Sequence, residues 1–388
     1  MTDAARRPAH DRCPGVFDPH PAADGALARI RLLGGTIGPD QMQTVARVAA
    51  EFGDGFVELT GRANLQIRGI GDVDAVADAL TDAGLVPSSS HEKVRNIEVS
   101  AVTGRIGGLG DLRPTAGALD AAIRADAALS ELSGRFLFGL DDGHGDIVTR
   151  GPDAAAVLRG DPGHGASAAD IVLDGEVVGS VTDVADIPAA LTAVAADMVE
   201  VGGDGRAWRI RDLDAAARAE LGARARDRLS APVDESLPDA PTSPIVGWFT
   251  QDDERVLLGA VVELGRLPAR LGEFLAAVEA PIVITPDREI LLCDLTEGVA
   301  ETVVRVLAPM GLIFDASSPW AQVSCCAGSP GCAKGLSPVR ADVLERVSSG
   351  EPITAREHWV GCARGCGTPP GPHLRVEATA DGYRREQR

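Results

Sequence analysis

Residues 56–70, FVELTGRANLQIRGI, alternate polar and apolar side chains in the way that a strand with one buried face does. Apolar residues at helical spacing come before this stretch at 39–52 and after it at 73–83. A further strand is predicted at 26–33. Together these patterns predict a small half-module in which strands and helices alternate.

A second copy of this half-module lies far downstream. Its predicted strands are 255–262 and 280–295, and its predicted helices are 267–277 and 301–310. The segment DAVADALTDAGL at 74–85 matches ETVVRVLAPMGL at 301–312 in length, pattern and ending. An internal duplication is the simplest cause of such a match.

Each half-module is followed by a mixed region, so the chain has the order A-B-A′-B′. The strand IEVSAV at 97–102 in the first mixed region is echoed by AQVSCC at 321–326 in the second. A Pro-rich stretch at 231–244 is the expected linker between the halves. The first mixed region has predicted strands at 96–102 and 135–141 and a predicted helix at 116–132. The predicted domains are 1–90, 91–235, 236–315 and 316–388.

Composition limits the classes of partner. The chain has 388 residues, and its 37 basic against 57 acidic side chains give a formal charge of −20. Such a charge opposes binding to nucleic acid or to anionic lipid, so neither is an expected partner. Neither a basic leader followed by an apolar stretch nor an apolar run long enough to span a bilayer is recognised, which makes the cytoplasm the expected compartment.

Cysteines cluster near the end of the chain. Five of the seven lie within 325–366, and in a reducing compartment they are unlikely to form a disulfide framework. The four predicted metal ligands are Cys326 and Cys332, spaced C-x5-C, and Cys362 and Cys366, spaced C-x3-C. Zinc knuckles favour shorter spacings, whereas an iron–sulfur cubane accepts wider ones in Gly-rich loops. A zinc site and buried free thiols remain alternatives.

The remaining side chains of the metal-ligating types are expected to have other roles. Because neighbouring side chains on a strand point to opposite faces, only one of Cys325 and Cys326 is expected to be a ligand. Cys13 and Cys293 stand alone and are expected to be structural. His358 could be a ligand, a proton donor or a packed strand residue. His144 and His164 lie in Gly-rich loops and are expected to be exposed.

The two cysteine pairs, the duplicated half-modules and the segment TGRANLQIRG at 60–69 together resemble the sulfite and nitrite reductase superfamily. Within it the chain is most similar to the precorrin-3B synthase family, the monooxygenases of the cobalamin pathway. The resemblance extends from DRCPG at 11–15 to HLRVEATADGYRR at 373–385. It implies an α+β fold with two ferredoxin-like halves around a pseudo-twofold axis, each paired with an α/β domain.

The resemblance also implies cofactors and partners. A [4Fe–4S] cluster is expected beside a tetrapyrrole cleft. In the reductases the tetrapyrrole is sirohaem, which shares with the cluster a cysteine that corresponds to Cys366. In the synthases the tetrapyrrole is the substrate, precorrin-3A. The enzyme uses dioxygen and reducing equivalents to hydroxylate this substrate at C20 and to close a γ-lactone. The resemblance to the synthases also implies a mononuclear non-haem iron. Since the chain lacks a Rossmann GxGxxG motif, a separate ferredoxin or NAD(P)H-linked reductase is the expected electron donor.

Two sequence features distinguish the synthases from the reductases. The Arg-Ala-Asn sequence at 62–64 resembles the synthases, whereas the reductases have Thr-Arg-Gln or a similar sequence here. Where the reductases place two lysines around a phenylalanine, this chain has Arg135-Phe136-Leu137. A sirohaem-dependent sulfite or nitrite reductase and an iron–sulfur electron-transfer protein are the alternatives.

A precorrin carries several carboxylates, so its site needs guanidinium groups in a protein that is acidic overall. Side chains at even positions along 56–70 are predicted to share one face, although any half-exposed strand shows the same pattern. The predicted catalytic residues are Arg62, Asn64 and Arg95. The predicted substrate-binding residues are Arg62, Asn64, Gln66, Arg68, Arg95 and Arg135. Asn64 could ligate a non-haem iron or form a hydrogen bond with the substrate.

The second copy differs from the first at these positions. Aligning 59–60 with 284–285 places Asp287 opposite Arg62 and Glu289 opposite Asn64. We therefore expect only the first half to bind an acidic ligand, and only the second half to hold the cluster.

Overall fold

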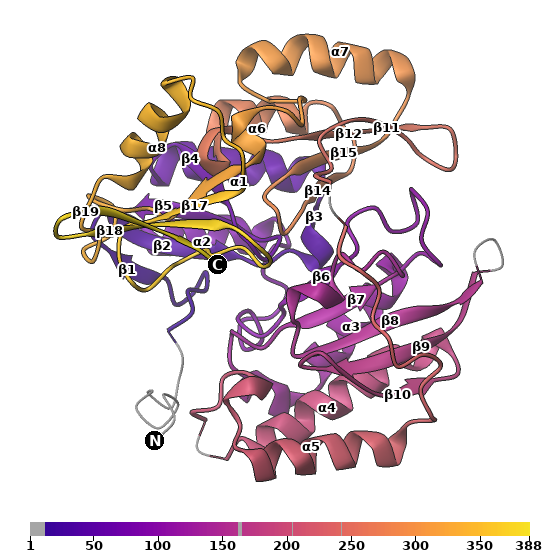
Figure 1. The fold of residues 1–388 in the computed structure, drawn as a ribbon. Helices are drawn as coiled ribbons and strands as arrows, with labels where there is room; N and C mark the ends of the chain where they lie inside the picture. Colours follow the sequence, from indigo (N-terminus) through magenta and orange to yellow (C-terminus); the bar gives the residue numbers. More distant parts are fainter. Residues whose placement is uncertain (1–11, 162–164, 204, 242) are drawn as a thin grey trace. The chain divides into compact units, whose positions relative to one another are not determined.

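A computed structural model describes residues 12–161, 165–203, 205–241 and 243–388 of the chain. It forms two compact units, which are described separately (Figure 1). Unit 1 consists of residues up to 13 together with 31–35 and 87–243, and unit 2 consists of 14–30, 36–86 and 244–388. Among the described residues, no helix has both the length and the hydropathy of a membrane span. The boundaries of the four predicted domains stay a prediction.

Two five-stranded sheets in unit 2 exchange one strand each. Their orders are β1-β2-β5-β4-β13 and β11-β12-β15-β14-β3. The first sheet contains β1 (His20–Ala22), β2 (Gly25–Ile30), β4 (Phe56–Leu59), β5 (Leu65–Ile70) and β13 (Arg266–Pro268). The second contains β11 (Gly247–Thr250), β12 (Val256–Ala260), β14 (Ile282–Ile284), β15 (Ile290–Leu295) and β3 (Thr36–Ile37). Each copy thus contributes an edge strand to the sheet of the other, as expected for a duplicated pair.

One helix of each copy packs against the other within the group of four helices that the two copies contribute. The four helices are α1 (Pro39–Phe52), α2 (Val73–Asp82), α6 (Ala269–Ala276) and α7 (Glu297–Leu307). Helices α1 and α6 are the packed pair. A Cβ atom added to Gly272 of α6 would lie only 3.1 Å from the Cβ of Ala46 in α1, so a glycine lets the two helices approach. The predicted helix 39–52 is confirmed. Helix α7 begins four residues before its predicted start at 301, because Gly298 weakens the helical pattern of its first turn.

One prediction about the first copy was wrong. Residues 56–70 are not a single strand, because β4 and β5 form a hairpin whose turn contains Ala63 at a φ of 53°. Arg62 and Asn64 therefore lie in or beside the turn and not within the strand that carries Gln66 and Arg68. The hairpin pairs Glu58 with Gln66, so even positions face even positions across it. The alternation therefore continues through the turn and resembles that of one strand.

The last part of unit 2 is a smaller mixed sheet with the order β16-β17-β18-β19. Its strands are β16 (Val323–Cys325), β17 (Glu357–Val360), β18 (Leu374–Thr379) and β19 (Gly382–Gln387), and α8 (Val339–Ser348) follows β16. Strands β16 and β17 run parallel. Val339 and Val343 of α8 pack with Trp359 and Val376 of the sheet in a small apolar core.

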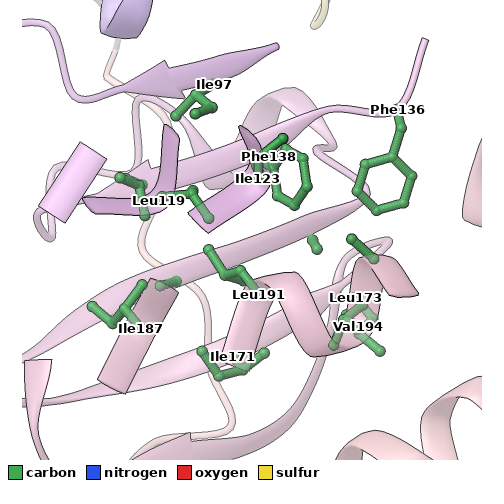
Figure 2. Packing of buried hydrophobic residues seen from close by; sticks show 14 of the residues in the cluster. Ile97, Leu119, Ile123, Phe136, Phe138, Ile171, Leu173, Ile187, Leu191 and Val194 are labelled. Carbon is green, nitrogen blue, oxygen red and sulfur yellow. The ribbon is translucent and has the colours of Figure 1, made fainter. Parts of the chain in front are cut away.

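Unit 1 contains a five-stranded sheet with the order β10-β9-β8-β7-β6. Its strands are β6 (Ile97–Val99), β7 (Phe138–Asp141), β8 (Ala154–Asp161), β9 (Gly165–Leu173) and β10 (Glu176–Val181). Its helices are α3 (Arg113–Ala125), α4 (Ile187–Val201) and α5 (Ala215–Arg228). Figure 2 shows Leu119 and Ile123 of α3, Phe138 of the sheet and Leu191 of α4 within one buried core. Helix α3 ends before the predicted residue 132, because Asp126 caps a separate 3-10 helix at Ala127–Glu131.

Candidate functional site

The two cysteine loops of unit 2 meet in space. They follow the neighbouring parallel strands β16 and β17, whose carboxyl ends lie at the same edge of the sheet. The Leu336 amide donates a hydrogen bond to the Gly361 carbonyl at 2.8 Å, and the Cys326 amide donates to the Trp359 carbonyl at 2.9 Å. These bonds join the loop that carries Cys326 and Cys332 to the segment that leads into Cys362.

Glycines allow this close approach. A Cβ atom on Gly361 would lie 3.2 Å from the Cα of Gly328 and 3.3 Å from the Cα of Gly335. A Cβ atom on Gly335 would lie 2.5 Å from the Ser329 amide nitrogen. Since any larger residue would push the backbones apart, these glycines keep the two loops in direct contact.

The four thiols interact electrostatically. All are free cysteines. Burial raises the pKa of the Cys366 thiol, and the nearby Arg364 opposes this rise. The cysteines at 326, 362 and 332 raise the same pKa further, which indicates that all four sulfurs share one region. Forming four thiolates there requires a compensating positive charge, such as that of a metal centre.

These residues fit an iron–sulfur cluster. The Gly361 amide donates a hydrogen bond to Cys326 Sγ at 3.2 Å, and amide hydrogen bonds to the sulfurs tune such clusters. Among the described residues, no three of the four sulfurs lie within 4.8 Å of one another. Sulfurs around one tetrahedral zinc ion would lie about 3.8 Å apart, so the present spacing is wider than zinc requires.

His358 supports the second cysteine loop. It is fully buried, and its Nδ1 lies 2.8 Å from Ser324 Oγ while its Nε2 lies 3.1 Å from the Cys366 carbonyl oxygen. Burial, together with the charge of Arg288, lowers the pKa of His358 to about 3, so the imidazole is neutral. A neutral ring that donates through Nε2 can accept from Ser324 through Nδ1. The side chain thus holds the backbone of Cys366.

Two of the other three cysteines, Cys13 and Cys293, are buried, and Cys325 is partly buried. Cys293 is fully buried in β15, and Cys13 is 9% exposed. Burial raises the pKa of Cys325 to about 12, against the opposing charge of Arg340. A thiol in such an environment stays protonated at neutral pH and is a poor ligand.

The first hairpin presents Arg62 on a rigid turn. Thr60 Oγ1 accepts hydrogen bonds from the amides of Arg62 at 3.4 Å and Asn64 at 3.1 Å. Arg62 is half-buried, whereas Asn64 is only 2% exposed. The remaining predicted residues of this strand bond to other groups of the protein. Gln66 bonds to Glu58 and to Arg29, and Arg68 forms an ion pair with Asp24.

The predicted single strand at 280–295 is also wrong, because β14 and β15 form a second hairpin. Its turn repeats that of the first hairpin with opposite charge at the position of Arg62. Thr285 Oγ1 accepts hydrogen bonds from the amides of Asp287 at 3.2 Å and Glu289 at 3.1 Å. Arg288 has a φ of 66°, close to that of Ala63 in the first hairpin. The predicted correspondence between the two copies therefore agrees with the geometry, and the second copy has carboxylates at the positions of Arg62 and Asn64.

Comparison with known proteins supports this description. Residues 20–83 match the family described as the nitrite/sulfite reductase ferredoxin-like half domain. The predicted resemblance is confirmed. A precorrin-3B synthase from Sinorhizobium sp is 25% identical over 394 residues, which cover 96% of this chain and 81% of that protein.

A solved structure of the Mycobacterium tuberculosis NirA protein shares the fold. The match has a TM-score of 0.73 at 18% identity, and it covers 93% of this chain and 73% of that chain. At this identity the match concerns the fold alone. It confirms the predicted α+β class.

Two predicted substrate residues belong to unit 1. Arg95 is 7% exposed, and its Nε donates to Asp120 Oδ1 at 2.5 Å. The Arg135 guanidinium carbon lies 4.9 Å from the ring centre of Trp208, in a cation–π arrangement. Both arginines therefore have interactions within unit 1, and their predicted roles in binding stay predictions.

An acidic group in unit 1 was not predicted. Ligand oxygens of Asp141, Asp142 and Asp146 lie within 4.8 Å of one another, and the sequence signal is DDGHGD at 141–146. The Asp141 carboxylate accepts four backbone N–H groups, from residues 143, 145, 147 and 148. Asp146 accepts hydrogen bonds from Ser100 Oγ and the Ala101 amide.

The Asp141 carboxylate holds the loop after β7 through four backbone N–H groups, so this carboxylate does not fit the mononuclear iron that the resemblance implies. Burial, with the charge of Asp141 added, raises the pKa of Asp146 to about 6. His144 was expected to be exposed, but it is only partly exposed, and its Nδ1 lies 2.6 Å from Asp142 Oδ1. His164 lies outside the described residues.

Proposed function

We propose that this chain is an oxygen-dependent precorrin-3B synthase, which hydroxylates precorrin-3A at C20 and closes a γ-lactone. The observation that carries the proposal is the extent of the similarity to the Sinorhizobium protein. It covers 96% of the chain, whereas the half-domain match is limited to residues 20–83. A monooxygenase adds one oxygen atom of dioxygen to its substrate and releases the other as water, so an electron donor is required. A ferredoxin or an NAD(P)H-linked reductase would supply these electrons.

Cys326, Cys332, Cys362 and Cys366 would hold a [4Fe–4S] cluster. When bound, this cluster would supply one-electron transfer. The chain contributes the environment: Gly361 donates to the Cys326 sulfur, and the glycine contacts keep side chains out of the space between the loops. His358 holds the carbonyl group of Cys366 through a hydrogen bond from its Nε2.

The first hairpin would bind the acidic substrate. The Arg62 guanidinium can bind a carboxylate through two parallel hydrogen bonds, and the Thr60 hydroxyl fixes the backbone from which it extends. Gln66 and Arg68 of this sheet are engaged by Glu58 and Asp24, so they are weaker candidates for direct contact with the substrate. Asn64 would form a hydrogen bond with a pyrrole or lactone group, or ligate an iron.

A sirohaem-dependent sulfite or nitrite reductase is the second candidate, favoured by the description of the family that residues 20–83 match. Such a reductase needs a second cationic side chain near Arg135 to supply protons, because its six-electron reduction consumes them. Here Leu137 occupies that position, and it is apolar and only 4% exposed. An apolar side chain supplies neither the charge nor the proton.

One assay separates the candidates. The purified protein is incubated with precorrin-3A, a reduced ferredoxin and air, and the products are separated by chromatography. We expect precorrin-3B to form in air and not under nitrogen. Stoichiometric sirohaem in the purified protein, with reduction of sulfite or nitrite by reduced viologen, would support the reductase instead. An iron–sulfur carrier without tetrapyrrole affinity would show no absorbance change in an anaerobic titration with precorrin-3A.

A further inference from the structure

Arg68 connects the first half-module to a cysteine loop. It lies in β5 and is 5% exposed. Its Nη2 donates a hydrogen bond to the carbonyl oxygen of Gly331 at 2.6 Å, across a separation of 263 residues. Gly331 immediately precedes Cys332, one of the four proposed ligands. The guanidinium is thus held against the peptide group that joins Gly331 to the ligand.

Asp24 fixes the orientation of this guanidinium. Arg68 Nε donates to Asp24 Oδ2 at 3.0 Å, and Nη2 donates to Asp24 Oδ1 at 2.9 Å. Two parallel bonds of this kind define the plane of the guanidinium. Burial alone would lower the pKa of Arg68, but the bonds with Asp24 and the charge of Glu58 raise it. The guanidinium is therefore permanently charged.

The contact also requires a glycine at position 331. A Cβ atom there would lie 2.8 Å from Asp24 Oδ2 and 3.4 Å from Arg68 Nη2. A larger residue would push the carbonyl group away from the arginine. We call Asp24, Arg68 and Gly331 the arginine latch.

The second copy has no equivalent charge. The alignment that pairs Thr60 with Thr285 pairs Arg68 with Cys293, which is fully buried in β15. Only the sheet of the first copy therefore carries a cation at this position.

We propose that Arg68 is a positioning residue for the iron–sulfur centre and not a substrate ligand. The proposal rests on the proposed function, because it assumes that Cys332 ligates the cluster. Through the latch, Arg68 fixes the backbone of Cys332 and places a positive charge beside the cluster loop. A positive charge there favours the reduced form, which is the more negative one, so it raises the reduction potential.

The test compares variants of the cluster-loaded protein. Arg68→Gln removes the charge, and Arg68→Lys keeps the charge but loses the bidentate contact with Asp24. Each is titrated potentiometrically with EPR detection, and iron release to a chelator is timed under nitrogen. Arg47→Gln is the matched control, because Arg47 forms an exposed pair with Glu51 in α1.

We expect Arg68→Gln to lower the midpoint potential and to alter the EPR signal, and Arg47→Gln to change neither. Losing a hydrogen bond to a charged group costs about 1.5–3 kcal/mol, so iron release should be about tenfold faster or more. Arg68→Lys should also release iron faster than wild type, but its midpoint potential should shift less than that of Arg68→Gln. The affinity for precorrin-3A should stay within about twofold of wild type in both variants of Arg68.

An unchanged potential, EPR signal and release rate in Arg68→Gln would overturn the proposal while leaving the cluster in place. A loss of precorrin-3A affinity with unchanged cluster properties would return Arg68 to a substrate role. If Arg68→Gln does not fold, Gly331→Ala tests the proposal instead, because it keeps every charge but obstructs the latch. Wild-type cluster properties in Gly331→Ala would also overturn the proposal. A wild-type protein without any cluster would instead contradict the proposed function.

Discussion

The two hairpins of unit 2 have the same backbone and opposite chemistry. In each, a threonine hydroxyl accepts two amides of the turn, and a residue other than glycine has a positive φ. The first turn presents Arg62, and the second presents Asp287, which pairs with Arg356. Because the threonine and the backbone define the turn, the other side chains can change without loss of the fold. The two copies thus share the scaffold of the turn and differ in its charge.

The loops that follow the parallel strands show the same division. In unit 2, Ser324 of β16 bonds to His358, and the loops after β16 and β17 carry thiols. In unit 1, Ser100 after β6 bonds to Asp146, and the loop after β7 carries carboxylates. Thiols can bind a soft metal centre, whereas the Asp141 carboxylate of unit 1 accepts backbone amides of its own loop. The loops of unit 1 therefore carry oxygen ligand atoms where those of unit 2 carry sulfur.

The largest expected effect separates cysteines within the second half. Cys326→Ser or Cys362→Ser should abolish the broad visible absorbance of the cluster, because a hydroxyl is a poor ligand for its iron. Cys293→Ser should keep that absorbance, since Cys293 lies buried in β15. Absorbance and acid-labile sulfide are measured after anaerobic purification. Full retention of the cluster in either ligand variant would contradict the assignment.

The next effect tests the charge difference between the hairpins. Arg62→Ala should weaken precorrin-3A binding by about 1.5–3 kcal/mol through loss of a charge-assisted hydrogen bond. Asp287→Ala is the matched control, and it should leave that affinity unchanged. Anaerobic absorbance titration measures both. Equal affinities in Arg62→Ala and wild type would remove the first hairpin from the binding site.

The carboxylate loop of unit 1 should show a pH dependence. The pKa of Asp146 is raised to about 6 from 3.8, so the folded state takes up a proton more readily than the unfolded state. Its contribution to stability is therefore present below about pH 4 and is lost as the pH rises to about 6, with a total of about 3 kcal/mol. Asp146→Asn should flatten this part of the profile in thermal unfolding scans. An unchanged slope would show that Asp146 titrates normally.

The smallest effect tests the shared turn. Thr60→Ala should destabilise the protein by about 1 kcal/mol, because two turn amides lose their acceptor. Thr285→Ala should cost more, since Thr285 Oγ1 also donates to the Glu289 carboxylate at 2.8 Å in a buried site. Denaturant midpoints of the two variants are compared. A larger loss of stability in Thr60→Ala than in Thr285→Ala would contradict the equivalent role of the two threonines.

Much of this organisation could be predicted from local patterns. Helix α1 has the apolar spacing of a helix with one buried face, and the cysteine spacings indicated two converging loops. The hairpin was missed because its register preserves the alternation of a single strand. The latch could not be predicted, since Gly331 is 263 residues from Arg68 and no local pattern links them. The acidic loop was missed because DDGHGD is also typical of an exposed turn.

The central claim is that the second half holds a [4Fe–4S] cluster while the tetrapyrrole arrives as substrate. The most direct test measures acid-labile sulfide and sirohaem in one sample purified under nitrogen. We predict about four sulfides per chain, which the four cysteines would hold, and no sirohaem. A protein without sulfide, or one that carries a sirohaem in each chain, would contradict the account.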